Sequence, residues 1–244
     1  MKRTLLTLVA LVAATIAVPA MAQLKWQAGK HYTIVPTQRP KVPAGKVEVM
    51  EVFSYGCPAC NQFRPVMKEL AARLPKNAQI VYLPASWNAP ENWPTFQRAY
   101  LTALSLGIAD KAHEAMYDAI WRTGELGIAD PATRQLKKTL PSMNDIAKFY
   151  ERTTGVKAQD FVNASKSFGV DLKIKQAEEQ IKAMQVLSTP TLVVAGKYRV
   201  NNDAFRTVDE IIEMVSFLVT KESAAAAAKP APAPATKPAP AVKP

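Results

Sequence analysis

The spacing of apolar residues predicts strands and one helix in the first third of the chain. Residues 47–53 alternate as a half-buried strand does, and Glu51 falls on the face shared by the odd-numbered positions. Residues 61–74 instead repeat apolar positions at helical spacing. Shorter β-like runs occupy 32–35 and 80–83. The predicted order is therefore strand, strand, helix, strand.

The middle of the chain carries a different pattern, because nearly every segment from 93 to 187 has helical periodicity. Its helices are separated by residue types that begin or end helices, namely acidic N-caps and C-terminal glycines. The predicted N-caps are Asp110 and Asp130, the latter followed by Pro131 at the first helical position, and the predicted C-caps are Gly107, Gly155 and Gly169. A long helix is predicted to begin at Asp171.

Strand patterns return towards the C-terminus. Residues 191–194 and 197–200 form a predicted hairpin around Ala195-Gly196, and residues 205–218 form a predicted amphipathic helix. Two strand-containing segments separated by a helical block predict one α/β domain interrupted by a helical insertion. We place the first part of that domain at 23–86, the inserted helical domain at 87–170 and the second part at 171–220.

The two ends are predicted to lie outside this fold. Residues 1–22 combine a basic start, an apolar stretch too short to cross a bilayer comfortably and the small-residue site Ala20-Met21-Ala22. They predict a signal peptide cleaved after Ala22, with an uncleaved membrane anchor as the alternative. Residues 221–244 hold ten Ala, six Pro and four Lys but no aromatic residue, which predicts a disordered tail.

Composition excludes several classes of function. The chain has 244 residues, of which 48% are hydrophobic and 21% charged, as is typical of a globular protein. The net charge is +11 for the whole chain and about +6 once the two ends are removed, spread without a long basic run, so no nucleic-acid partner is predicted. A four-ligand zinc site of Cys and His would need both cysteines and both histidines, which disfavours a zinc enzyme. We interpret His31 and His113 as isolated residues without catalytic roles.

The strongest chemical motif is Cys57-Pro58-Ala59-Cys60, which follows a predicted strand and opens a predicted helix. Unpaired N–H groups at a helix N-terminus stabilise a thiolate at Cys57, and the thiolate attacks or leaves in disulfide exchange. Cys60 lies one turn further along and is expected to be the buried, resolving thiol. Pro58 suits a first helical turn, where no N–H is needed. A structural disulfide, half of a metal site and chance spacing are alternatives that explain this placement less well.

These residues resemble a known family. The segment from Glu51 to Cys60, with Ser188-Thr-Pro-Thr191 far downstream, is similar to the thioredoxin-fold DsbA-like thiol:disulfide oxidoreductases. The resemblance implies a thioredoxin fold with an inserted helical domain, and periplasmic oxidation of exported polypeptides that carry free thiols. It also implies reoxidation by a DsbB-like membrane quinone reductase and no cofactor beyond the Cys57–Cys60 disulfide. We expect a monomer.

The resemblance also assigns roles to individual residues. Cys57 matches an exposed nucleophile and Cys60 its buried partner. Pro190 matches a cis-proline that leaves the backbone of Thr189 facing the disulfide, free to pair with an extended substrate. Glu51 matches a buried acid whose raised pKa lets it relay a proton to or from Cys60, with an ordinary solvated glutamate as the alternative.

Three departures from the best-known members bear on oxidising strength. Ala59 stands where those members have a histidine that helps to stabilise the thiolate, Thr189 replaces an aliphatic residue, and residues 79–83 lack the lysine that pairs with the buried acid. A less stable thiolate means a weaker oxidant. An oxidase remains the favoured hypothesis, and a reductase or isomerase, or a redox-inactive peptide-binding chaperone, are the alternatives. We recognise no dimerisation domain before Lys30, which disfavours the isomerase.

Overall fold

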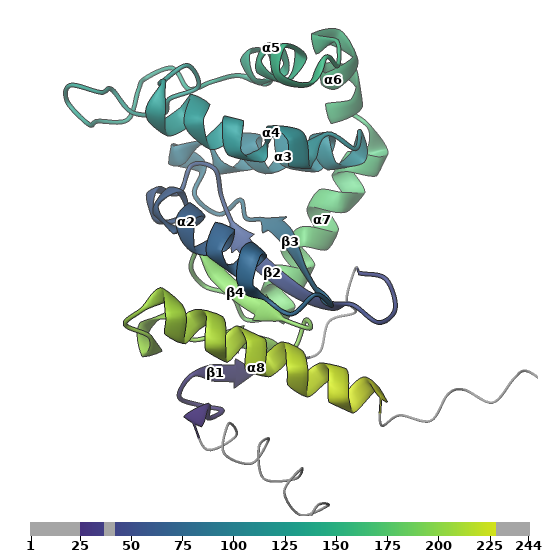
Figure 1. Cartoon of the computed structure of the whole chain (residues 1–244). Coiled ribbons are helices and arrows are strands. Elements are labelled where there is room, and N and C mark those ends of the chain that lie inside the picture. The colour runs from purple at the N-terminus through teal and green to yellow at the C-terminus, as the bar shows by residue number, and fades with distance from the viewer. Residues whose placement is uncertain (1–24, 37–41, 228–244) are drawn as a thin grey trace, which may run out of the picture.

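A mixed five-stranded sheet forms the centre of the protein. The structure, a computed structural model, describes residues 25–36 and 42–227, and the predicted signal peptide lies outside the described residues (Figure 1). The strands are β1 (Tyr32–Ile34), β2 (Val47–Phe53), β3 (Ala78–Pro84), β4 (Thr191–Val194) and β5 (Tyr198–Val200). Their order in the sheet is β1-β5-β4-β2-β3, with β2 parallel to β3 and antiparallel to β4.

Helices cover both faces of the sheet and form a further layer at one end of it. The helices are α2 (Pro58–Arg73), α3 (Trp93–Ser105), α4 (Ala109–Tyr117), α5 (Met143–Thr154), α6 (Ala158–Ser165), α7 (Phe168–Ala183) and α8 (Val208–Ala227), with a π-helical turn at Asp118–Arg122 and 3₁₀ turns at Ala89–Glu91 and Asn202–Ala204. The chain leaves the sheet after β3 and returns in β4, with a helical insertion that includes α3 to α6 and with α7 leading back to the sheet (Figure 1). The predicted α/β fold with a helical insertion is confirmed.

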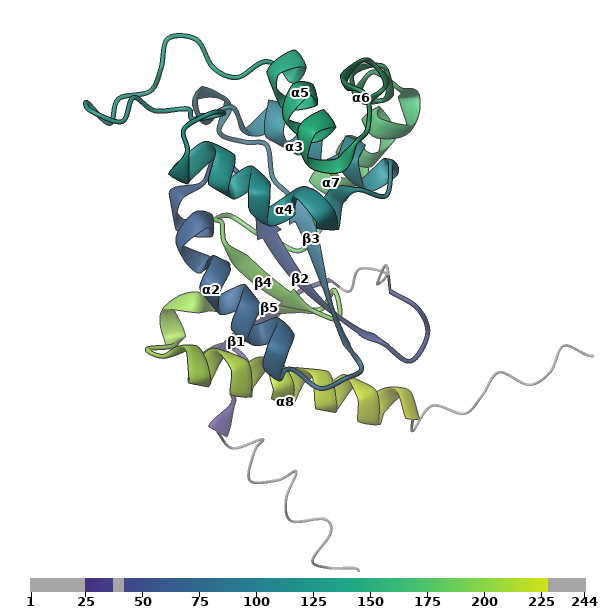
Figure 2. The same cartoon turned by 45° about the horizontal axis from the view of Figure 1, so that its top comes forward.

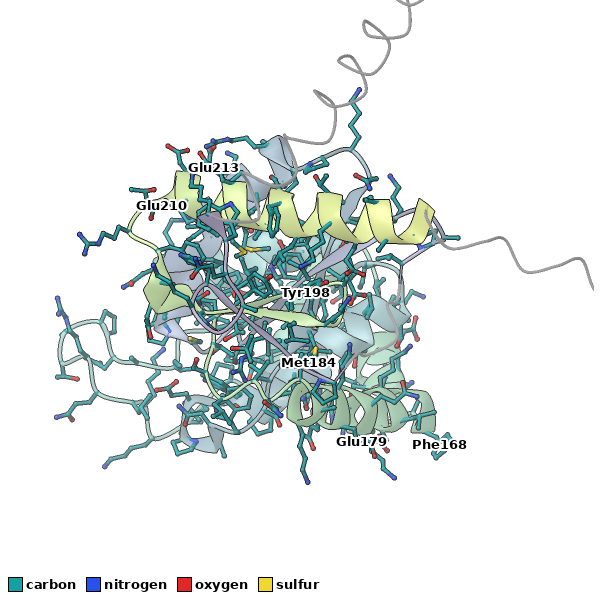
Figure 3. The ribbon with its side chains drawn as sticks, turned by 90° about the horizontal axis from the view of Figure 1, so that it is seen from below. Phe168, Glu179, Met184, Tyr198, Glu210 and Glu213 are labelled. Carbon is teal, nitrogen blue, oxygen red and sulfur yellow. The ribbon has the colours of Figure 1, made fainter. Side chains whose placement is uncertain are left out.

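Two apolar cores lie on opposite sides of the sheet, which Figure 3 shows between α8 and α7. The core under α2 and α8 includes Val49, Leu70 and Met214. The core under α7 and the inserted helices includes Val52 and Phe96. Because β2 runs through the middle of the sheet, all seven of its residues are buried, and the burial of side chains along β2 does not depend on which face they occupy.

The segment between the π-helical turn and α5 is not helical, so the N-cap predicted at Asp130 is wrong. Asp130 Oδ1 accepts hydrogen bonds from the backbone N–H groups of Ala132 at 3.0 Å and Thr133 at 2.8 Å, and thereby closes a turn. Ala129 and Leu136 form an isolated β-bridge across that turn, and Figure 2 shows the loop projecting from the helices. Asp-Pro is a local helix signal, but the residues after it are mostly exposed and give a helix no apolar face to bury.

Helix starts differ from the prediction in two further places. α7 begins after Ser167, whose Oγ accepts a backbone N–H at 3.3 Å, so Gly169 does not end a helix and Asp171 does not begin one. Glycine is disfavoured inside helices, which made Gly169 a misleading stop signal. Asp110 lies in the first turn of α4 and is not its N-cap. Gly155 does end α5, with a φ of 84°.

The predicted disordered tail begins too early, because α8 continues through residues 221–227. Glu222 accepts hydrogen bonds from Lys197 Nζ at 2.9 Å and from the Tyr198 hydroxyl at 2.6 Å, both from the β4–β5 hairpin. Asn77 donates to Ser223 Oγ at 2.6 Å. These tertiary contacts hold the alanine-rich end of α8 against the sheet, whereas composition alone indicated a free tail.

Candidate active site

The two cysteines lie where β2 passes into α2. Cys57 is the N-cap of α2, with φ −84° and ψ 117°, and its Sγ accepts the backbone N–H of Cys60 at 3.4 Å. Pro58 occupies the first helical position, where a missing N–H costs nothing. Both cysteines are free thiols, so the structure represents the dithiol form. The motif therefore opens a helix, as its sequence predicts.

Cys57 is less exposed than the resemblance implies. Its exposed fraction is 5%, against 1% for Cys60, while Pro58 and Ala59 are exposed. The carbonyl oxygen of Thr189 lies 3.5 Å from Cys57 Sγ and covers part of it. Only a small part of the Cys57 side chain is therefore accessible to solvent.

The two thiols have opposite acidities. The Cys60 side chain donates a hydrogen bond that, against the effect of burial, lowers the pKa of Cys57 to about 6, with further help from Thr189 and from the backbone N–H groups of Cys60 and Ala59. Burial raises the pKa of Cys60 far above its ordinary value, and the hydrogen bond to Cys57 adds to the effect. At neutral pH Cys57 is the thiolate and Cys60 holds the proton.

Glu51 lies beneath the cysteine pair on β2. It is 3% exposed, and its register partner on β3 is Tyr82, at the strand where the family's lysine is missing. Burial raises the pKa of Glu51 well above its ordinary value, and the negative charges of Cys57 and Glu114 raise it further. No salt bridge within the described residues involves Glu51. Burial at this position therefore favours the neutral carboxylic acid over the carboxylate.

The segment before β4 faces Cys57 from the other side. The Thr189–Pro190 peptide bond is cis, as the resemblance implies. Asn202 Nδ2 donates to the Pro190 carbonyl oxygen at 2.7 Å and fixes this turn. A groove of about 470 Å³ runs along residues 185–191 and 199–203, and Leu187 at its edge is 89% exposed.

Sequence reasoning missed a group of buried aromatic residues behind the motif. His113, interpreted as isolated, is packed among rings that include Phe53, Tyr55 and Tyr82. Burial lowers the pKa of His113 to about 3. Tyr55 and His113 lie 58 positions apart, and no local pattern joins them. Only the packing of α4 against the β2–α2 junction brings them together.

Two further findings concern the described residues only. They contain no group of three or more Cys, His, Asp or Glu side chains that could hold a metal ion. None of the helices formed by those residues is both long and apolar enough to span a membrane.

A reactive dithiol at a helix N-terminus, opposite a cis-proline turn on a mixed sheet, defines a dithiol oxidoreductase with a thioredoxin fold. A family model described as Thioredoxin matches residues 42–214. The chain is 33% identical to the thiol:disulfide interchange protein DsbA of Pseudomonas syringae, covering 93% of this chain and 99% of that protein. It is 30% identical to the DsbA of Pseudomonas aeruginosa at the same coverage. The crystal structure of DsbA from Xylella fastidiosa is similar, with a TM-score of 0.68 and 30% identity, covering 82% of this chain and 98% of that chain.

The chain therefore belongs to the thioredoxin family, as a thiol:disulfide oxidoreductase of the DsbA type.

Proposed function

We propose that this protein is a periplasmic oxidase that donates its Cys57–Cys60 disulfide to exported polypeptides with free thiols. The observation that carries this proposal is the opposite acidity of the two thiols, with the pKa of Cys57 lowered to about 6 and that of Cys60 raised. A stable Cys57 thiolate favours the dithiol over the disulfide, and a disulfide that is readily reduced is an oxidant.

The reaction begins with the protein in its disulfide form. A substrate thiolate attacks Cys57 Sγ, the Cys57–Cys60 bond breaks, and Cys60 leaves with the electron pair as a thiolate. A second substrate thiolate then attacks the substrate sulfur of the mixed disulfide. Cys57 leaves as a thiolate, the substrate gains a disulfide, and the protein gains two electrons as a dithiol. No cofactor takes part, because the two sulfurs carry the electrons.

Glu51 supplies the proton that this reaction needs inside the protein. Cys60 is almost fully buried, and burial raises the pKa of its thiol, so a bare thiolate there is unstable. Glu51, protonated in its buried position, gives its proton to Cys60 as the Cys57–Cys60 bond breaks, and regains a proton from water afterwards. Pro58 and Ala59 shape the first turn of α2, and the backbone of Ala59 adds an N–H donor to Cys57.

Substrate contact is provided by the segment around the cis-proline. The Thr189 backbone faces Cys57, and an extended substrate segment can pair with it as an added strand. The adjoining groove and the exposed Leu187 offer contact to apolar side chains without selecting one sequence. Such contact suits unfolded polypeptides, which present many different segments.

The compartment and the partner follow from the same assignment. The signal peptide predicted at residues 1–22 supports export, and disulfides persist in the periplasm. Each turnover leaves the dithiol, so a further oxidant must regenerate the disulfide. We assign this step to a DsbB-like membrane quinone reductase, and we take the protein to act as a monomer.

The test is the equilibrium of the cysteine pair with glutathione. The reduced fraction is measured by acid quenching, alkylation and mass spectrometry across glutathione ratios, with Cys57→Ser as the control for non-specific alkylation. A potential above about −180 mV is expected for an oxidase. A potential near about −270 mV, the value for thioredoxin, makes the protein a reductase instead. If the cysteine pair does not exchange with glutathione at all, the redox-inactive chaperone is the hypothesis that remains.

A further inference from the structure

The inserted helices contact Tyr55, the residue two positions before the nucleophile Cys57. Tyr55 is 1% exposed, and its hydroxyl lies 3.0 Å from His113 Nδ1 on α4. The backbone carbonyl of the same residue accepts a hydrogen bond from Trp121 Nε1 at 2.8 Å, from the π-helical turn after α4. The hydroxyl and the backbone carbonyl of Tyr55 are therefore both hydrogen-bonded to the insertion, although Tyr55 itself belongs to the β2–α2 junction.

The next residue is enclosed by the same insertion. A Cβ atom on Gly56 would lie 2.5 Å from the backbone oxygen of Glu91 and 2.8 Å from Cδ1 of Trp93, which is closer than atoms can approach. The inserted segment at the start of α3 thus lies directly against the backbone at Gly56. Positions 55 and 56 have little freedom to move unless the insertion moves with them.

This turn determines where the nucleophile lies. Ser54 Oγ accepts the N–H of Gly56 at 3.2 Å, and the Ser54 carbonyl accepts the N–H of Cys57 at 3.1 Å. A shift at Tyr55 therefore moves Cys57 relative to its donors at the start of α2 and to the Thr189 carbonyl. Charge on a sulfur is stabilised only where donors are already in place.

The histidine is suited to a permanent contact. Its ring lies 4.1 Å from the Tyr82 ring and 5.4 Å from the Tyr117 ring, measured between centroids, and it is 7% exposed. Burial, with a smaller effect of the Arg64 charge, lowers its pKa to about 3. His113 is therefore neutral throughout the range in which Cys57 titrates, and its hydrogen bond to Tyr55 does not switch.

We propose that the Tyr55–His113 hydrogen bond is a positioning contact through which the inserted helices hold the active-site turn and set the oxidising strength of the cysteine pair. His113 touches neither sulfur in this role and acts through Tyr55. The proposal deepens the proposed function. It rests on that function only for the assumption that the oxidising strength of the cysteine pair is used to oxidise substrates.

Tyr55→Phe is the first test, because it removes one hydroxyl and keeps the ring. We expect the equilibrium constant with glutathione to shift about three- to tenfold towards the disulfide, the size of effect that one buried hydrogen bond can produce. The alkylation profile of Cys57 is expected to move to higher pH in parallel. Tyr117→Phe is the matched control, since the Tyr117 hydroxyl is buried in the same cluster without a hydrogen-bond partner among the described residues. It should leave both readouts unchanged.

Two substitutions at position 113 separate hydrogen bonding from packing. His113→Asn keeps a polar group near the Nδ1 position, and an amide can partner the Tyr55 hydroxyl whichever group donates. His113→Leu fills more of the volume of the histidine ring than Asn does, but its side chain has no polar atom. We expect Asn to stay near the wild-type equilibrium and Leu to match Tyr55→Phe, although Leu packs better.

The proposal is overturned if His113→Leu stays near the wild-type equilibrium while His113→Asn shifts it. It is also overturned if a folded Tyr55→Phe protein keeps the wild-type equilibrium and alkylation profile. Circular dichroism and urea unfolding verify that each variant is folded at the assay temperature. Because the readouts compare variants, a wild-type potential in the reductase range would refute the oxidase and leave this comparison intact.

Discussion

The lowered pKa of Cys57 makes the stability of the reduced protein depend on pH. The pKa falls from 9.0 to about 6 on folding, chiefly because the Cys60 thiol donates to the Cys57 sulfur. A group with a depressed folded pKa stabilises the protein fully above its unfolded pKa and loses that effect as the pH falls through the folded value. The reduced protein should therefore lose stability between pH 9 and pH 6.

The magnitude follows from the size of the shift. Three pKa units correspond to about 4 kcal/mol, and screening by solvent reduces this to about 2 kcal/mol. The disulfide form has no thiol to ionise, so its stability should lack this dependence. Ionisable groups remote from the cysteine pair contribute to both forms and largely cancel in the difference.

Urea unfolding of both redox forms between pH 5 and pH 9.5 measures this effect. The stability of the dithiol relative to the disulfide should rise by about 2 kcal/mol with increasing pH. The Cys57→Ser protein has no ionisable group at position 57 and cannot form the disulfide, so its own stability is compared with that of the dithiol at each pH. The dithiol should gain stability relative to this variant as the pH rises. A difference that stays constant with pH would refute the view that hydrogen bonding at the helix N-terminus stabilises a thiolate.

Three other substitutions test the site and the fold. Glu51→Gln removes the proton donor for Cys60 and should slow formation of the mixed disulfide by about 100-fold at pH 7, measured by stopped-flow fluorescence, whereas an unchanged rate excludes proton relay. Thr189→Val removes a group that helps to lower the pKa of Cys57, so the alkylation profile should move to higher pH; a shift to lower pH would contradict this. Glu222→Gln should cost about 1 kcal/mol in urea unfolding, because two hydrogen bonds at the end of α8 lose their charge. The exposed control Glu179→Gln should cost less than about 0.5 kcal/mol, and equal losses would show that Glu222 does not hold α8.

The sequence predicts the features that depend on neighbouring residues. The alternation in 47–53 and the helical spacing after Cys57 place the motif at a strand–helix junction, because the decisive residues lie within a few positions of each other. The cis peptide bond at Pro190 came from family resemblance, since a proline before a strand is ordinarily trans. The positions of Cys57, Cys60 and Pro190 were thus within reach of sequence reasoning.

Features that depend on distant packing were not predicted. Asp130 carries a sound helix-start signal, yet the segment after it has no apolar face to bury, so a turn forms there. Glu222 follows the last apolar helix and looks like the start of a tail, yet the β4–β5 hairpin holds it. The family resemblance implies an exposed Cys57, yet Thr189 covers it from more than a hundred positions away. For Glu222 and Cys57 the deciding contact comes from a distant part of the chain.

The absence of a histidine at position 59 matters less than the motif alone indicates. The Ala59 side chain is exposed, but its backbone N–H still helps to lower the pKa of Cys57, after the Cys60 thiol and Thr189. These donors persist whichever side chain occupies position 59. Burial holds the proton on Cys60 independently. The division of the dithiol into thiolate and thiol therefore arises from the β2–α2 junction and the cis-proline turn, and residue 59 only adjusts how strongly the thiolate is favoured.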